Sequence, residues 1–124
     1  MIIQAMALLD LRGSERVLDL FCGLGNFTLA AATRCAEVVG VEVSATMVER
    51  VLQNARHNSL DNIRAVAFDL TDTVSDQSWA KENYDILIID PPRSGAKEVL
   101  EDLSLKQIDR ILYVSCNPTT FARD

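Results

Sequence analysis

The chain has 124 residues, the length of one domain, and 48% of them are hydrophobic, which is enough for an ordinary buried core. Its formal net charge of −6 argues against a domain that holds nucleic acid by a basic surface of its own. No run of apolar residues reaches the roughly 18 that a membrane helix needs, and no basic leader follows Met1, so we expect a cytoplasmic protein.

Strand-like and helix-like segments alternate along the chain. In chain order, the pattern predicts a helix over residues 2–11, strand 16–21, a glycine-rich turn 22–25, helix 27–34, strand 37–42, a helix from the N-cap Ser44 to about residue 58, strand 62–68, a weaker helix 73–82, strand 84–90, helix 96–105, strand 110–115 and the start of a further helix. This alternation predicts an α/β fold of the Rossmann-like type with a parallel sheet, in a single domain over residues 1–124.

Polar residues cluster where the predicted strands end. In parallel sheets, ligands bind beyond the carboxyl ends of the strands. The turn with Gly23 and Gly25 lets a ligand approach the backbone closely, and Glu42 at the next strand end can accept both ribose hydroxyls of an adenosine. A dinucleotide site favours a third glycine where this chain has Thr28, whereas S-adenosylmethionine has no phosphate to seat. Asp69, at the third strand end, suits the adenine amino group.

Three cysteines, Cys22, Cys35 and Cys116, form no Cys-x-x-Cys pair, which argues against a disulfide framework or a metal site. Cys116 ends the fifth predicted strand, and Asn117 and Pro118 suit the start of a helix. A thiol at a helix N-terminus is favoured as thiolate, so Cys116 is the candidate nucleophile. Cys22 and Cys35 are interpreted as small buried hydrophobes.

Four segments together carry a resemblance. DLFCGLGNF, GVE, IIDPPRSG and YVSCNPTTFARD, which span residues 16–124, are similar to the RNA (uracil-5-)-methyltransferase family. Cytosine-5 RNA methyltransferases have a cysteine where this chain has Arg93, and adenine-N6 enzymes prefer an aromatic residue there. The DPPR and SCNP motifs together therefore distinguish this family from other class I methyltransferases.

The resemblance implies the class I methyltransferase fold and a covalent mechanism. The Cys116 thiolate would attack C6 of a uracil, C5 would accept the methyl group of S-adenosylmethionine, and loss of the C5 proton would expel the thiolate. The family pattern places five residues in the cofactor site, namely Phe21, Asn26, Glu42, Asp69 and Asp90. It implies RNA as partner, ribosomal rather than transfer RNA, with the target base turned out of its stack. Arg93 is either a target contact or a solvated loop charge.

The resemblance also implies that parts of the family's pattern lie outside this chain. The proton-abstracting glutamate and the last two strands are expected beyond Asp124, and an RNA-binding domain before Met1. We therefore expect little turnover from these 124 residues, and self-association through an exposed fifth strand.

Two alternatives remain open at this point. One is a class I methyltransferase for another base or for protein, which would not need Cys116. The other is a non-catalytic nucleotide-binding module or remnant. The missing third glycine weakens its dinucleotide form, and the intact Cys116 and Asp90 weaken the remnant form.

Overall fold

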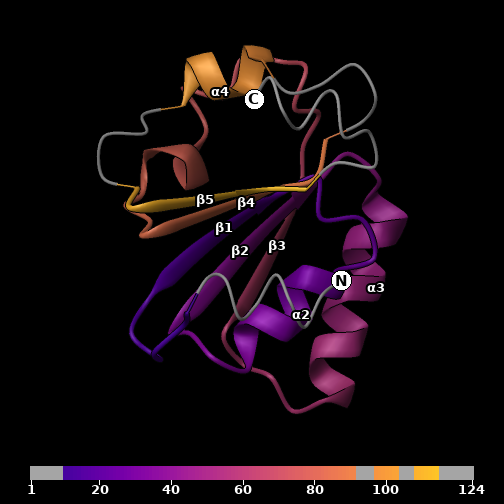
Figure 1. Cartoon of the computed structure of the whole chain (residues 1–124). Coiled ribbons are helices and arrows are strands. Elements are labelled where there is room, and N and C mark those ends of the chain that lie inside the picture. Colours follow the sequence, from indigo (N-terminus) through magenta and orange to yellow (C-terminus); the bar gives the residue numbers. More distant parts are fainter. Residues whose placement is uncertain (1–9, 92–96, 104–107, 115–124) are drawn as a thin grey trace.

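The computed structural model describes residues 10–91, 97–103 and 108–114, and within them it contains a parallel sheet of five strands (Figure 1). The strands lie in the order β3-β2-β1-β4-β5. Their bounds are β1 Arg16–Leu20, β2 Glu37–Glu42, β3 Ile63–Ala67, β4 Ile86–Ile89 and β5 Arg110–Tyr113. The α/β fold with a parallel sheet is therefore confirmed.

Helices cover both faces of the sheet. Helices α2 (Asn26–Ala32) and α3 (Ala45–His57) lie on one face, and the short 3₁₀ helix η1 (Ser78–Lys81) and α4 (Lys97–Asp102) lie on the other (Figure 1). Ser44 caps α3 as predicted, because its hydroxyl accepts the N–H of Met47 at 3.3 Å.

The central strands are apolar because both of their faces are covered. All four residues of β4 are buried, and the sequence ILII packs against helices on either side. Leu18, Leu87 and Ile89 belong to the cluster under η1 and α4, whereas Val17 and Ile88 belong to the cluster under α2. The strands run parallel, so their carboxyl ends meet at one edge of this buried sheet, where the candidate residues lie.

The predicted helix over residues 73–82 is wrong, since only the four residues of η1 are helical there. The segment before η1 is a loop, and a side chain of another element, α4, binds its backbone. The carboxylate of Asp102 accepts the N–H of Val74 at 2.6 Å and that of Ser75 at 3.3 Å. A contact from α4, far away in the sequence, therefore overrides the local helical pattern.

The predicted helix over residues 2–11 lies almost wholly outside the described residues, and so does the segment after Val114. Strand β5 borders the sheet within the described part, and Ile111 on it is half exposed. Self-association through this strand stays a prediction. Among the described helices, none combines the length and the apolar character needed to cross a membrane.

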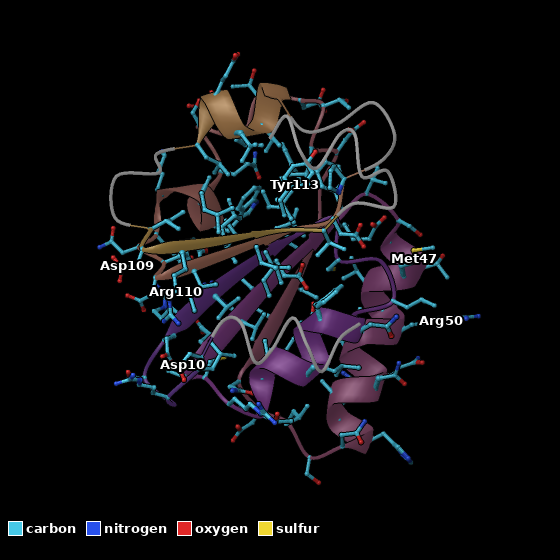
Figure 2. All side chains as sticks on the ribbon, viewed as in Figure 1. Asp10, Met47, Arg50, Asp109, Arg110 and Tyr113 are labelled. Atoms are coloured by element: carbon cyan, nitrogen blue, oxygen red, sulfur yellow. The ribbon has the colours of Figure 1, made fainter. Side chains whose placement is uncertain are left out.

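Ion pairs tie the amino ends of the strands together. Arg16 donates to Glu37 at 2.7 Å and to Glu82 at 2.5 Å, and its guanidinium lies 5.1 Å from the ring centre of Tyr84. Arg64 also reaches Glu82, at 2.6 Å. Figure 2 shows Arg110 on the same side of the molecule as Asp10, whose carbonyl it contacts at 3.4 Å.

Candidate functional site

The carboxyl ends of four strands enclose one cavity of about 390 Å³. Phe21, Glu42, Asp69 and Asp90 all line it, each from just beyond or at the end of a different strand. Sequence reasoning missed the other lining residues, which are Val43, Phe68, Leu70, Thr71 and Pro91. Thr71 is polar, and the other four are apolar residues that stand in the sequence next to Glu42, Asp69 or Asp90.

The turn between β1 and α2 has an unusual backbone. Phe21 has a φ of 59°, a conformation that a bulky residue adopts only at a cost, and Gly23 and Gly25 have φ of 56° and 86°. A Cβ on Gly25 would lie 2.9 Å from a methyl of Val51, so α3 packs directly on the turn. Phe21 also lines the cavity, and backbone outliers of this kind gather at functional sites.

Glu42 joins this turn to the second strand. One of its carboxylate oxygens accepts the N–H of Gly23 at 3.3 Å, and the other accepts the N–H of Ser44 at 2.9 Å. A carboxylate has about four acceptor positions, so lone pairs remain for a ligand. The side chain is thus oriented by backbone and still able to accept two hydroxyl groups.

Asp69 and Asp90 differ in their surroundings. Asp69 accepts the hydroxyl and the N–H of Thr71, at 2.7 and 2.9 Å, and these bonds lower the pKa of its exposed carboxyl. Burial raises the pKa of Asp90, which is half-buried at the end of β4. The backbone of Asp90 is fixed beside β1, because its N–H donates to the carbonyl of Leu20 at 3.3 Å.

A further carboxyl lies under α2. Asp19 in β1 is fully buried, and it accepts a hydrogen bond from the hydroxyl of Thr28 at 2.6 Å. A Cβ on Gly40 would lie 3.1 Å from the sulfur of Cys22 and 3.3 Å from the Thr28 hydroxyl, so the glycine makes room for both. Thr28, which replaces the third glycine of a dinucleotide motif, therefore has a buried partner that the sequence did not reveal.

The two described cysteines are poor nucleophiles. Burial raises the pKa of Cys22 to about 12, with Asp19 and Glu42 adding to the effect, and burial raises that of Cys35 to about 11. A thiol with such a pKa is neutral at physiological pH. Cys116, the predicted nucleophile, lies outside the described residues, and so does Arg93.

Asn26 is exposed in the first turn of α2 and does not line the cavity. The structure thus brings together four of the five predicted cofactor residues. Within the described part of the chain, no three His, Cys, Asp or Glu side chains are grouped so that they could hold a metal ion.

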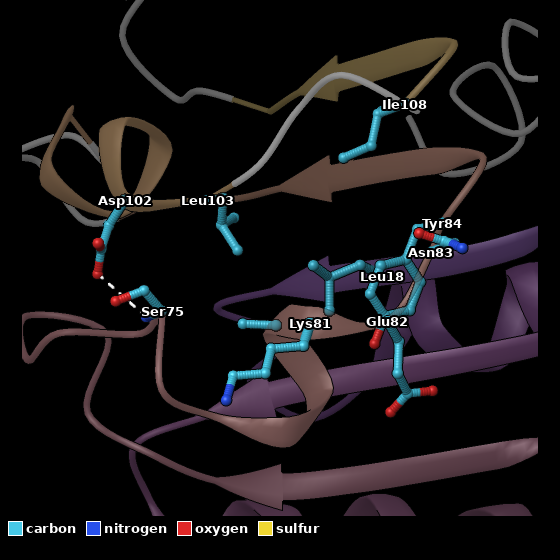
Figure 3. Close-up of a pocket in the computed structure, with 10 residues that line it drawn as sticks. Leu18, Ser75, Lys81, Glu82, Asn83, Tyr84, Asp102, Leu103 and Ile108 are labelled. Atoms are coloured by element: carbon cyan, nitrogen blue, oxygen red, sulfur yellow. Dashed lines mark hydrogen bonds between the residues drawn. The ribbon is translucent and has the colours of Figure 1, made fainter.

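A second cavity, of about 340 Å³, lies between η1 and α4 (Figure 3). It reaches the residues that precede β4 and β5, such as Tyr84 and Ile108, and is therefore remote from the strand carboxyl ends. Asp102 in its wall bonds to the backbone at Ser75, as Figure 3 shows, and so serves to hold the loop.

Several known proteins are similar to this chain in sequence. The family model described as tRNA (Uracil-5-)-methyltransferase matches residues 1–124. The 23S rRNA (uracil(1939)-C(5))-methyltransferase RlmD of Alcanivorax borkumensis is 54% identical over 124 residues, which are 100% of this chain and 28% of that protein. The RlmD protein of Xanthomonas oryzae pv. oryzae gives the same identity and coverage. The chain therefore spans less than a third of these relatives.

A solved structure agrees with this relation. The Pyrococcus abyssi tRNA (uracil-54, C5)-methyltransferase in complex with S-adenosyl-L-homocysteine has a TM-score of 0.80 and 28% identity, and the match covers 98% of this chain and 30% of that one. Because the family model matches the whole sequence given, the chain belongs to the tRNA (Uracil-5-)-methyltransferase family.

Proposed function

We propose that residues 1–124 form part of the catalytic domain of an enzyme that transfers a methyl group from S-adenosylmethionine to C5 of a uridine in RNA. The observation that carries the proposal is the cavity of about 390 Å³ in which Phe21, Glu42, Asp69 and Asp90 meet. Family membership supports the reaction class, and the cavity supports the cofactor.

The lining of the cavity fits this cofactor. S-adenosylmethionine carries a sulfonium, an ammonium and a ribose diol, which are groups that carboxylates bind well. Three carboxylates line the cavity, and no Lys or Arg is among its described lining residues. A pyrophosphate would meet like charge there, which argues against a dinucleotide.

Each residue has a distinct proposed contact. Glu42, oriented by the N–H groups of Gly23 and Ser44, would accept the ribose hydroxyls. Asp69 would accept the adenine amino group, and Phe21 would offer its ring to the apolar part of the ligand. Asp90 would face the cationic part, and Asn26 would contact the ligand from α2. The bound cofactor supplies the methyl group.

The RNA partner and the nucleophile are proposed from the family. The Cys116 thiolate would add to C6 of the uracil, and C5 would then take the methyl group. A base would accept the C5 proton, and the electron pair of that C–H bond would re-form the C5–C6 double bond and expel the thiolate. We propose ribosomal RNA, because the relatives at 54% identity are named as 23S rRNA enzymes, whereas the tRNA enzyme is 28% identical. A cytoplasmic site of action follows from such a substrate.

Calorimetric titration of the chain tests the cofactor. We expect S-adenosylmethionine to bind and NADH not to bind. Glu42→Gln should weaken binding at least about tenfold, because a hydrogen bond to a charged group is lost. Glu49→Gln is the matched control, since Glu49 is an exposed carboxylate of α3. Binding of NADH, or unchanged affinity in Glu42→Gln, would contradict the proposed site.

Cys116→Ala in the longer protein tests the nucleophile. We expect complete loss of methyl transfer to a uridine-containing rRNA fragment, together with normal cofactor binding. Retained transfer would favour a methyltransferase of another mechanism.

A further inference from the structure

Asp19 is the carboxyl that the proposed reaction does not use. It is 1% exposed near the carboxyl end of β1, one residue before Leu20, and lies between Gly40 of β2 and Ile88 of β4. Thr28 donates to one of its oxygens at 2.6 Å. The other oxygen, Oδ1, is buried and has no hydrogen-bond partner among the described residues. A carboxylate so poorly solvated is costly in its charged form.

Among the described residues, no positively charged group compensates a charge on Asp19. Burial raises its pKa to about 7, the Thr28 hydroxyl opposes that rise, and the charge of Asp90 adds to it. The neighbouring Cys22 thiol, with a pKa of about 12, stays neutral. Within the described part of the chain, Asp90 is thus the charged group whose field raises the pKa of Asp19.

Asp90 connects this buried carboxyl to the cavity. It lies two positions after Ile88, the strand neighbour of Asp19, and its N–H bonds to the carbonyl of Leu20. Asp90 also lines the cavity. A cation bound beside Asp90 would offset the negative field that reaches Asp19 and would add an attraction of its own.

We propose that Asp19 keeps its proton while no cation occupies the strand-end cavity, and releases it to the solvent when a cationic ligand binds beside Asp90. The inference rests on the proposed function, in which that ligand is S-adenosylmethionine. Only the O–H bond of Asp19 breaks, and the proton passes to the buffer. Thr28 donates to the carboxyl in both states, so the turn keeps its place. By linkage, the affinity for the cation rises with pH.

The direct test follows the side-chain carboxyl carbon of Asp19 by NMR as a function of pH, with Asp19→Asn to assign the signal. In the free chain we expect a titration midpoint near neutrality. Saturating S-adenosylmethionine should move the midpoint to lower pH. A midpoint at ordinary acidic values in the free chain, or one that the ligand leaves unchanged, would overturn the proposal.

Calorimetry in buffers of different ionisation enthalpy gives a second readout. Wild type should release more protons on binding than Asp19→Asn does near pH 7. Its affinity should also rise at least about threefold more between pH 6 and pH 8. The comparison between variants removes the titration of the ligand's own amino group. Asp76→Asn, a change at an exposed carboxyl, should behave as wild type.

The amides of Gly23 and Val43 separate the two possible failures. If they do not respond to S-adenosylmethionine, the proposed cofactor is wrong and the coupling fails with it. If they respond while the Asp19 midpoint stays fixed, the cofactor stands and the coupling alone is wrong.

Discussion

At the amino end of the sheet, carboxylates meet arginines. At the carboxyl end, the described carboxylates meet only backbone N–H groups and hydroxyls. Glu37 and Glu82 are both bound by Arg16, whereas Glu42 is held by two N–H groups and Asp69 by Thr71. One end thus has its charges neutralised internally. At the carboxyl end, the carboxylates keep free acceptor positions, which suits the binding of a cationic ligand. The same unneutralised charges lower the stability of the fold.

The largest effect that we expect concerns Asp19, the most buried carboxyl at the carboxyl end of the sheet. Its pKa is about 7 in the folded chain against an ordinary value of 3.8, so the folded chain binds more protons between these values. Wild type should therefore lose stability as pH rises from 4 to 7. Asp19→Asn should lack this loss, which we place at roughly 2–4 kcal/mol.

Denaturant unfolding of both proteins at several pH values measures that loss. Parallel pH profiles for wild type and Asp19→Asn would show that the carboxyl carries no such cost. Asp19 would then no longer support the claim that the carboxyl end of the sheet costs the fold stability.

Gly25→Ala tests whether the carboxyl end also depends on backbone shape. The new methyl would approach Val51 to 2.9 Å at a φ of 86°. We expect a loss of about 1–3 kcal/mol in the free energy of unfolding. Gly13→Ala is the matched control, because its φ of 107° is also left-handed while no atom lies within 4 Å of the added carbon. Equal losses would mean that the packing of α3 on the turn adds nothing.

Arg16→Ala tests the paired end. The ion pairs of Arg16 are partly exposed, with about a third of each side chain accessible, so we expect a loss of only about 1 kcal/mol. Salt should reduce that loss. Arg12→Ala is the control, since its ion pair with Asp10 is largely exposed and should contribute almost nothing. A salt-independent loss would assign the effect of Arg16 to its packing on Tyr84.

Much of this arrangement was predictable from the sequence. The carboxyl ends of parallel strands meet at one edge, so residues at strand ends such as Glu42 and Asp90 had to lie near one another. The apolar run of β4 likewise predicted burial on both faces. In both cases a local pattern determines the outcome.

What the sequence did not reveal depends on contacts between distant segments. Asp19 stands in the strand-like run RVLDLF, and nothing local shows that Thr28 is its partner. The loop before η1 is fixed by Asp102, so the local helical pattern over residues 73–82 misleads. Val43 and Phe68 line the cavity because the ends of β2 and β3 lie side by side in the sheet, next to that of β1.

The central claim is that the ligand binds at the carboxyl end of the sheet, where no arginine pairs with the described carboxylates. Amide chemical-shift mapping with S-adenosylmethionine tests this claim most directly. We predict shifts at Gly23, Val43 and Phe68, around the cavity at the carboxyl end, and none at Arg16 or Glu37. Shifts confined to the amino end of the sheet, or to the second cavity near Ser75 and Leu103, would show that the ligand does not bind at the carboxyl end.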